Sequence, residues 1–425
     1  MAATVLAYAA VSHRLERTVV SAAIFFVTVG LALGNKGLDW IDIQGDGSQI
    51  RILAEITLTL VLFADASRID LRTAWREHAV PARLLGIGLP LTIFAGWLIG
   101  VVAFGDLGGA EVLILAVILA PTDAALGQAV VTDQRLPSRI RQGLNVESGL
   151  NDGLCVPILL IAIAIASTDD GKVTGHHAVK LVVEAIGGGA IGGVVAGGLA
   201  ALIVTVAVPR KLIASSWLQV VPVAAAALGY GLASALDGSG FIAAFVGGIV
   251  YGALHPSTGG EASYLIEELG ELTNAITFLV FGAVFVGPML SNLTWAAGLY
   301  ALLSLTVVRM IPVAIALIGT RPRLQTTAYV GWFGPRGLAS IVFIVITLEG
   351  TTLIHSDVIV SAVVATITVS VYAHGVTARP LTDRYVRWYQ SHPRDELPRM
   401  ESVPVSQQRW RRPVSAAAVP AHRRE

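Results

Sequence analysis

The sequence predicts an all-α, polytopic membrane protein with about 13 transmembrane helices, and three observations support this fold class. Its 425 residues are 54% hydrophobic and 14% charged, with a mean hydropathy of +0.71, whereas a soluble domain is roughly 45–50% apolar and about 25% charged. Apolar runs long enough to cross a hydrocarbon core of about 30 Å recur along the chain. The runs lack the alternation of a β-barrel, so helices are the remaining way to satisfy backbone polar groups in lipid.

The predicted helices are the apolar runs between charged residues or Gly and Pro boundaries. They lie near residues 2–13, 17–34, 50–67, 79–104, 109–132, 139–167, 177–208, 215–236, 238–254, 271–290, 294–319, 325–348 and 353–378. The first run has only about eleven apolar residues, which is too few to cross a full bilayer. A partial first helix and a start further upstream both remain open.

The loop charges predict the orientation, because Lys and Arg are enriched on the cytoplasmic side of membrane proteins. Alternate loops are basic and contain Arg14, Arg17, Arg68, Arg72, Arg76, Arg83, Arg135, Arg139, Arg141, Arg210, Lys211, Arg321 and Arg323. One loop on this side is acidic, and Glu261, Glu267, Glu268 and Glu271 are interpreted as the solvated start of a helix. Asp65 lies near a helix end on the same side, where a cation funnel and a helix cap are equally compatible with its position.

The remaining segments predict no further chemistry. Residues 381–425 are expected to form a disordered cytoplasmic tail, since they are rich in Arg and Pro and lack apolar periodicity. Cys155 is the single cysteine, which excludes a disulfide within the chain, and no spacing typical of metal-cluster ligands is present. Five histidines are placed at helix ends and interpreted as solvated, namely His176, His177, His255, His355 and His374.

Two carboxylates lie inside one apolar segment, in the run Glu147-Ser148-Gly149-Leu150-Asn151-Asp152. An ionised Asp at the centre of a spanning helix costs about 2.5–3.5 kcal/mol on insertion scales, so a compensating role is expected. On a helix, Ser148 and Asp152 form one i,i+4 column and Glu147 and Asn151 the adjacent one, so all four side chains can face one cavity. Carboxylate, hydroxyl and amide oxygens suit a hard monovalent cation. The alternative is a set of structural hydrogen bonds.

Two of the predicted spans are interrupted by proline. Ala120-Pro121-Thr122-Asp123 divides the span from 109 to 132, and Gly334-Pro335-Arg336-Gly337 divides the span from 325 to 348. Interrupted spans in corresponding positions of two halves predict an inverted-repeat transporter with its site at the midplane. For the first interruption, a simple kink capped by Asp123 is the alternative.

Arg309 and Arg336 also lie in apolar segments, and their guanidinium charges require neutralisation. Glu147 is the expected partner of Arg309, which leaves Asp152 available for titration. Arg336 lies beside a break, where helix-end dipoles or Asp123 are its candidate partners. Both arginines are interpreted as organising the site, although a purely structural role fits equally well.

The residues quoted above, together with Pro137-Ser138-Arg139, resemble the NhaP-like branch of the cation/proton antiporter-1 family, which includes animal sodium/proton exchangers. The resemblance implies a homodimer of thirteen-helix chains in which helices five and twelve are broken and cross. It implies a moving core at about 79–167 and 294–380, dimerisation helices at about 1–67 and 215–290, and a linker helix at 177–208.

The same resemblance assigns roles to individual residues. It implies Asp152, Asp123, Ser148 and Thr122 as ligands of Na⁺, and Glu147, Asn151, Arg309 and Arg336 as residues that organise the site. One departure is that Ala124 follows the Thr-Asp pair where the family usually has proline.

We therefore expect a secondary antiporter in the plasma membrane that exchanges Na⁺ for protons and regulates intracellular pH and Na⁺. A proton and a cation would compete for Asp152, and the resemblance suggests electroneutral exchange, since Asn151-Asp152 offers one titratable group. Its partners would be monovalent cations, protons, lipid and a second copy, with no cofactor, no nucleic acid and no enzymatic activity. A K⁺/H⁺ antiporter, a cation channel and an intramembrane aspartyl protease using Asp123 and Asp152 are the alternatives, although the Gly-x-Gly-Asp signature of that protease is absent from the sequence.

Overall fold

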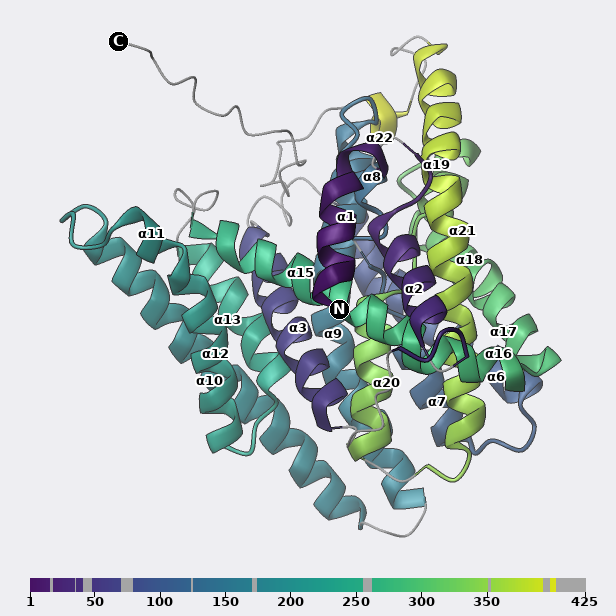
Figure 1. Cartoon of the computed structure of the whole chain (residues 1–425), viewed down its shortest axis with the longest axis horizontal. Coiled ribbons are helices and arrows are strands. Elements are labelled where there is room, and N and C mark those ends of the chain that lie inside the picture. Colours follow the sequence, from purple (N-terminus) through teal and green to yellow (C-terminus); the bar gives the residue numbers. More distant parts are fainter. Residues whose placement is uncertain are drawn as a thin grey trace.

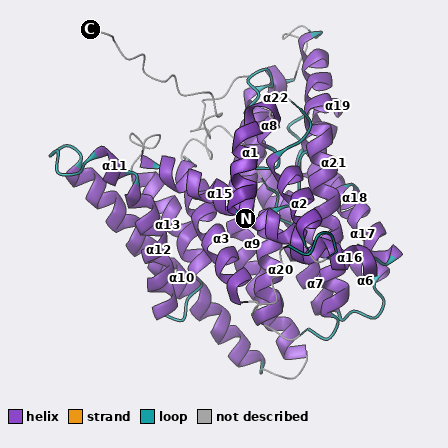
Figure 2. Ribbon diagram, in the orientation of Figure 1, coloured by secondary structure: helices purple, strands orange, loops and turns teal. Residues whose placement is uncertain are grey.

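The computed structural model of the chain is helical throughout the part that it describes (Figure 2). That part comprises residues 1–15, 18–34, 36–40, 48–69, 79–123, 125–169, 174–254, 262–350, 353–392 and 398–402. No strand occurs within these ranges. The predicted all-α class is therefore confirmed.

The helices follow one another along the chain as a series of spans joined by short loops (Figure 1). The first part contains α1 (Ala2–Leu15), α2 (Ala22–Leu33), α3 (Ser48–Arg68), α5 (Ala79–Arg83), a π-helical turn (Leu84–Gly88), α6 (Leu89–Ala103), α7 (Gly109–Ile118), α8 (Gln128–Val131) and α9 (Ser138–Asp169). The middle part contains α10 (Gly175–Ala207), α11 (Ser215–Leu218), α12 (Val220–Ala235), α13 (Gly240–Leu254), α15 (Tyr264–Phe281), a second π-helical turn (Gly282–Val286) and α16 (Gly287–Asn292). The last part contains α17 (Trp295–Leu305), α18 (Val307–Ala316), α19 (Leu324–Trp332), α20 (Leu338–Gly350), α21 (Ser356–Gln390) and α22 (Arg399–Ser402).

The lengths of the helices fit a polytopic membrane protein. Seven continuous helical stretches in the described residues are long and apolar enough to cross a membrane, and four further apolar helices are shorter. Because some predicted spans are short or divided into two helices, the number of thirteen crossings stays a prediction.

One side of the molecule is a fan of closely packed helices formed by α10, α12 and α13, which lie at the left of Figure 1. Glycines of α10 form the contact: a Cβ atom on Gly193 would lie 2.6 Å from the carbonyl oxygen of Ala243, and one on Gly197 would lie 2.2 Å from that of Gly247. Small residues of this kind allow backbones to approach closely in membranes. The glycine-rich run of α10 is therefore a packing surface.

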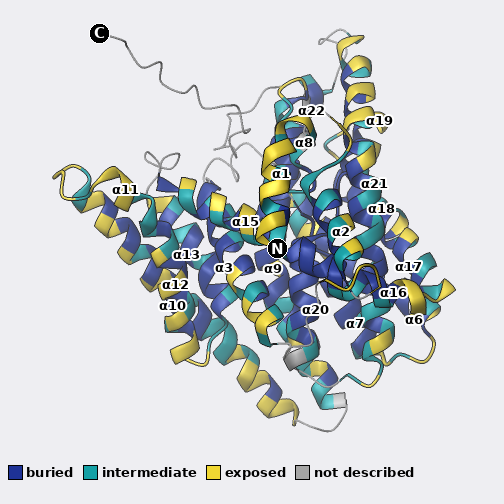
Figure 3. Cartoon of the chain, viewed as in Figure 1, coloured by how far each residue is buried: buried dark blue, intermediate teal, exposed yellow. Residues whose placement is uncertain are grey.

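The outer face of α10 is apolar and exposed, as the yellow residues of Figure 3 show. Val183, Ile191 and Leu202 are exposed on this helix. Large exposed apolar surfaces are typical of proteins that contact lipid or other subunits, which agrees with a membrane-spanning bundle.

The other side of the molecule is a bundle formed by two matching sets of helices, α5–α9 and α17–α21. Each set has a broken helix between two longer ones, with the breaks between α7 and α8 and between α19 and α20. Many residues of α7, α9 and α20 are buried, and they are coloured dark blue in Figure 3. This is the predicted inverted repeat with two broken helices.

Two predicted boundaries are wrong. Helix α15 begins at Tyr264, seven residues before the predicted start at 271, so Glu267 and Glu268 belong to the helix. Helix α21 continues to Gln390 through Pro380, so the tail predicted at 381–425 does not begin at residue 381. Tyr385 and Val386 are buried on this extension, and their packing against the bundle explains why the helix continues.

The short helix α22 also packs on the bundle. The carboxylate oxygen Oε1 of Glu401 accepts hydrogen bonds from the backbone N–H of Arg323 at 2.9 Å and from the hydroxyl of Thr326 at 2.7 Å. Met400 and Glu401 are both buried. The predicted disorder is therefore wrong for residues 398–402 as well, whereas residues 393–397 and 403–425 lie outside the described part of the chain.

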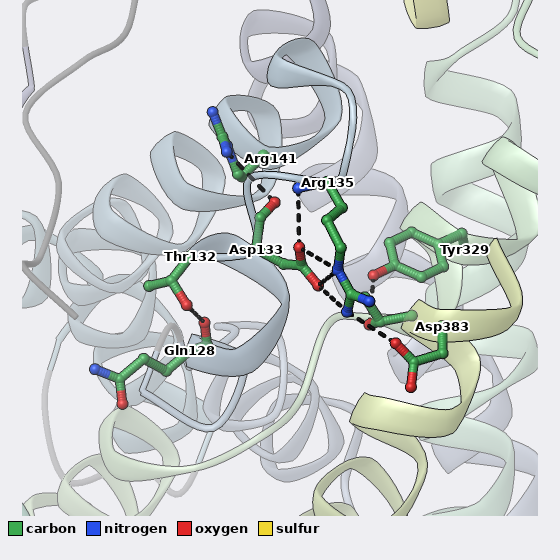
Figure 4. A network of polar contacts seen from close by, with 8 residues as sticks. Gln128, Thr132, Asp133, Arg135, Arg141, Tyr329 and Asp383 are labelled. Atoms are coloured by element: carbon green, nitrogen blue, oxygen red, sulfur yellow. Dashed lines mark hydrogen bonds and ion pairs between the residues drawn. The ribbon is translucent and has the colours of Figure 1, made fainter. Parts of the chain in front are cut away.

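A polar cluster connects the loop before α9 with the extension of α21 (Figure 4). The guanidinium of Arg135 contacts Asp133 at 2.7 Å and Asp383 at 2.8 Å, and the Arg141 side chain donates to the carbonyl oxygen of Asp133 at 3.3 Å. Burial of Asp133 opposes its ionisation, but the hydrogen bonds and charge of Arg135 outweigh that effect and lower the pKa of Asp133. Asp133 is therefore ionised at neutral pH, and the cluster holds the end of α21 against the start of α9.

The fan of α10 and α13 depends on the absence of a side chain at Gly197. In Gly197→Ala the new methyl group would meet the backbone of Gly247 at 2.2 Å, so the helices must separate. We expect a destabilisation of about 1–3 kcal/mol, the usual effect of overpacking. Gly198→Ala is the matched control, because nothing lies within 4 Å of the position that its Cβ would take. Melting temperatures of the purified protein in detergent measure both; equal melting temperatures for the two variants would contradict the close approach.

Candidate cation-binding site

The two breaks meet inside the bundle. The loop after α7 and the loop after α19 contact each other through their backbones, since the N–H of Asp123 donates to the carbonyl oxygen of Pro335 at 2.8 Å. Non-helical backbone at membrane depth is tolerated only where it is enclosed by protein or lines a cavity. The crossing therefore satisfies part of the backbone that each break exposes.

Asp123 caps the helix that follows the other break. Its Oδ2 accepts a hydrogen bond from the N–H of Leu338, the first residue of α20, at 2.9 Å, and its Oδ1 accepts from the N–H of Ala125 at 2.7 Å. A carboxylate at a helix N-terminus satisfies exposed donors and is stabilised by the helix dipole. A Cβ at Gly337 would lie 2.1 Å from Oδ2 of Asp123, which explains the glycine in the Gly-Pro-Arg-Gly run.

Arg336 caps the helix that precedes the first break. Its Nη1 donates to the carbonyl oxygens of Ala120 at 2.9 Å and Pro121 at 3.1 Å, just beyond the C-terminus of α7. The side chain is fully buried. Of the two partners that the sequence left open for Arg336, the helix-end carbonyls are therefore the ones it contacts. A cation at a helix C-terminus complements the negative end of the dipole.

Glu147 and Arg309 form the predicted ion pair. Nη2 of Arg309 donates to Oε2 of Glu147 at 2.8 Å, and Nη1 donates to Oε1 in the same bidentate arrangement. Each side chain is only 3% exposed. A Cβ on Gly334 would lie 2.3 Å from Nε of Arg309, so this glycine makes room for the guanidinium beside the second break.

Thr122 joins the first break to α9. The hydroxyl of Ser148 donates to the carbonyl oxygen of Thr122, and Nδ2 of Asn151 donates to the hydroxyl of Thr122 at 2.7 Å. All three residues are buried, as is Asp152 one turn beyond Ser148. The four predicted ligands, Thr122, Asp123, Ser148 and Asp152, thus lie in one small region, together with Asn151.

A cavity opens beside Asp152 and Asp123. Together with the open space at its mouth it measures about 450 Å³. Its lining also includes Asp65 and Arg68 of α3, Glu267, Glu271 and Asn274 of α15, and Leu338 of α20. Arg68 contacts Glu267 at 2.7 Å and Asp65 at 3.1 Å.

Two of these lining residues refine the sequence interpretation. Asp65 pairs with Arg68 on the wall of the cavity. Of the two roles left open for Asp65, a cation funnel and a helix cap, this position favours the cation funnel. Glu267 and Glu271 also line this cavity from within α15, and they are not merely a solvated helix start.

His374 is a residue that the sequence interpretation missed. It was placed at a solvated helix end, but it lies inside α21 and is 1% exposed. Its Nε2 lies 2.9 Å from the carbonyl oxygen of Trp332 and its Nδ1 lies 3.2 Å from Oγ of Ser370. The hydroxyl of Ser370 accepts from the N–H of Arg336 at 2.6 Å.

A neutral imidazole that carries its proton on Nε2 donates to the carbonyl oxygen of Trp332, and its Nδ1 can accept from the hydroxyl of Ser370. Nδ1 also lies 3.0 Å from the carbonyl oxygen of Ser370, so the tautomer with the proton on Nδ1 would donate there instead. His374 and Ser370 thereby join the two ends of the second break, Trp332 before it and Arg336 after it. The signal in the sequence was the i,i+4 spacing of Ser370 and His374 in an apolar run.

Oxygen atoms are the donors that the site offers to a cation. Within the described residues, no group of three or more His, Cys, Asp or Glu side chains is placed to hold a metal. What converges instead is two carboxylates with neutral hydroxyl, amide and carbonyl oxygens. Hard cations are bound by oxygen ligands of this kind.

Comparison with known proteins agrees with the geometry. Residues 1–384 match the model of the family described as sodium/hydrogen exchanger, transmembrane. The chain belongs to the sodium/hydrogen exchanger family. The resemblance inferred from the sequence is therefore confirmed over most of the chain.

The relatives that are named as antiporters are distant from this chain in sequence. The K⁺/H⁺ antiporter NhaP of Alkalimonas amylolytica is 24% identical over 329 residues, which cover 75% of this chain and 54% of that protein. The Na⁺/H⁺ antiporter of Schizosaccharomyces pombe is 25% identical over 351 residues, covering 77% of this chain and 73% of that protein. The chain thus spans about half the length of the Alkalimonas relative.

The fold is also that of a solved exchanger structure. The sodium proton antiporter MjNhaP1 from Methanocaldococcus jannaschii superposes with a TM-score of 0.72, covering 91% of this chain and 97% of that chain at 18% identity. The antiporter fold predicted from the sequence, with two broken crossing helices, is confirmed by this likeness.

Glu147→Gln should destabilise the protein, because it leaves the guanidinium of Arg309 buried without its carboxylate. Removing one partner of a buried ion pair costs about 3–5 kcal/mol. The double variant Glu147→Gln with Arg309→Met should recover part of that loss. Melting temperature and yield in detergent are the measurements; a stable Glu147→Gln protein that has selectively lost ion binding would show that Glu147 is a ligand instead.

Proposed function

We propose that this chain is a secondary antiporter that exchanges Na⁺ for protons across a membrane. The observation that carries the proposal is the position of Asp152, buried on α9 at the wall of a cavity that also contacts Asp123. Its neighbours on α9 and the first break, Ser148 and Thr122, add hydroxyl and carbonyl oxygens in the same region. Asp152 is proposed as the carboxylate that carries the transported charge.

Competition for that carboxylate couples the two fluxes. A proton or a cation neutralises Asp152, but the two do not do so together. Moving an uncompensated charge through a low-dielectric region is costly, so only a loaded site crosses readily. Exchange then follows from alternating access of one site to the two sides of the membrane.

The named relatives support an exchanger of monovalent cations. The Schizosaccharomyces pombe relative is named for Na⁺ and the Alkalimonas amylolytica relative for K⁺. K⁺/H⁺ exchange is therefore the second candidate function, and Na⁺ is the ion that we propose. With the Asn151-Asp152 pair offering one titratable group, we propose electroneutral exchange.

The position of the cavity supports different roles for the two sides of the molecule, one as a moving core and the other as a scaffold. α9, α20 and the first break form one wall, while α3 and α15 form the other. We propose that the first wall belongs to a moving core and the second to a scaffold that dimerises. We also propose that the mouth of the cavity faces the cytoplasmic side of the plasma membrane, which the distribution of basic loops supports.

Asp152→Asn should abolish exchange, because the variant has no carboxylate to hold either substrate. Cation-induced proton movement in everted membrane vesicles, followed with a pH-sensitive dye, measures it. Asp106→Asn is the control, since Asp106 is exposed in the loop between α6 and α7. Undiminished exchange in Asp152→Asn vesicles would exclude the proposed mechanism.

The apparent KM for Na⁺ should rise as the pH falls, because protonated Asp152 cannot bind the cation. One-proton competition gives a rise of up to about tenfold per pH unit in the range where the carboxylate is mostly protonated. Initial rates over a series of Na⁺ concentrations and pH values measure it, and an imposed membrane potential should leave these rates unchanged. A KM independent of pH would argue against a shared site, and rates that follow the potential would argue against electroneutrality.

A further inference from the structure

We infer that Asn274 of α15 supplies an oxygen ligand to the transported cation, from the wall of the cavity opposite Asp152. The inference rests on the proposed function, because it concerns the cation that Asp152 is proposed to hold. Every ligand predicted from the sequence lies on α9 or in the first break. Asn274 would add a ligand from a different helix, α15.

The predicted ligands occupy only one side of the cavity. Thr122 and Asp123 come from the first break, and Ser148 and Asp152 come from α9. A cation that has lost its water needs oxygens distributed around it, since each ligand replaces part of the hydration shell. The facing wall, formed by α3 and α15, must therefore contribute oxygen atoms or leave water in place.

α15 presents one face to this cavity. Glu267, Gly270, Glu271 and Asn274 are spaced three and four residues apart, the spacing of neighbours on one helix face, and all four line the cavity. Asn274 lies seven residues beyond Glu267, which corresponds to about 10 Å along the helix axis. The polar face thus runs from carboxylates at the mouth to a neutral amide deeper in the bundle.

The amide of Asn274 has an unused acceptor. The residue is 9% exposed, and its Oδ1 is buried with no hydrogen-bond partner among the described residues. Buried acceptors without a partner are rare in native structures and call for an explanation such as a bound ion or water. An oxygen beside a cavity that reaches two carboxylates is placed to meet a cation.

The wall that carries Asn274 is fixed in position. The hydroxyls of Thr57 and Thr277 lie 3.3 Å apart and join α3 to α15 near Asn274. Nearer the mouth, Arg68 of α3 contacts Glu267 of α15 at 2.7 Å. With α15 tied to α3 on both sides of Asn274, the amide is held in place before a cation arrives, which lowers the entropic cost of binding.

The neutral amide also suits a monovalent cation. A carboxylate in place of Asn274 would add negative charge to a cavity already lined by Asp65, Asp123, Asp152, Glu267 and Glu271, and would favour divalent ions or protons. An amide oxygen adds coordination without adding charge, so one cation remains sufficient to neutralise the site.

Asn274→Leu tests the inference, because leucine keeps a similar volume but has no oxygen. We expect the apparent KM for Na⁺ to rise about tenfold in vesicles, the effect of losing about 1.4 kcal/mol of binding. Stabilisation of the purified protein by added Na⁺ should fall by a similar factor in affinity. Without Na⁺, the melting temperature should be unchanged or higher, because a buried polar group without a partner is removed.

Asn274→Asp and Asn292→Ala complete the comparison. Asn274→Asp keeps an oxygen at this position, so it should bind Na⁺ at least as tightly as Asn274→Leu at every pH. At high pH, where the new carboxylate is ionised, it should bind Na⁺ more tightly than Asn274→Leu. Asn292 is exposed in α16, so its change to Ala should leave both KM and Na⁺ stabilisation unaltered. Unchanged KM and unchanged Na⁺ stabilisation in Asn274→Leu would overturn the inference, as would a loss of melting temperature without Na⁺, which would mark a structural role.

The Asp152→Asn variant separates this inference from the proposed function. If exchange persists in Asp152→Asn, the proposed function fails and the role of Asn274 fails with it. If Asp152→Asn is inactive while Asn274→Leu binds Na⁺ as the unaltered protein does, only the role of Asn274 is overturned.

Discussion

The bundle depends on an exchange of caps between two broken helices. Asp123 from the first break closes the N-terminus of α20, and Arg336 from the second closes the C-terminal end of α7. Each charge lies where the helix dipole stabilises it, so the two breaks support one another inside the bundle. Ser370 and His374 extend this arrangement to α21. Polar backbone can therefore be exposed at the centre of the bundle, where a cation site needs it.

The charges of the bundle can be considered as a set. Asp123 and Arg336 bring opposite charges to the two breaks, and Glu147 neutralises Arg309. In the proposed mechanism Asp152 carries the negative charge that either one proton or one monovalent cation neutralises. The ion pair of Glu147 and Arg309 is then an element of charge balance as well as a tether between α9 and α18.

Features of the site that are energetically unfavourable in an apolar span could be predicted from the sequence, and features that depend on long-range contacts could not. Charged residues in apolar spans are so unfavourable that Glu147, Asp152, Arg309 and Arg336 stand out, and the pairing of Glu147 with Arg309 follows from there being few partners. The partner of Arg336 depends on the tertiary structure. The sequence alone could not decide between the helix-end carbonyls and Asp123. His374 was missed because it lies four residues before the predicted end of its helix at residue 378, and the i,i+4 spacing with Ser370 was not considered. The extension of α21 was missed because the stabilising contacts of Tyr385 and Val386 are long-range, while Pro380 and the arginines suggested an end.

The glycine contact between α10 and α13 has a mechanical consequence. Where backbones touch without intervening side chains, there is no layer of rotamers that can rearrange while one helix slides over the other. The fan of α10, α12 and α13 is therefore stiff against shear. Helix α3, which packs on α13, and α15, which packs on α3, extend this stiff body as far as the cavity. In the proposed alternating access, such a body would be the fixed part, and the displacement would occur at the boundary that the cavity occupies.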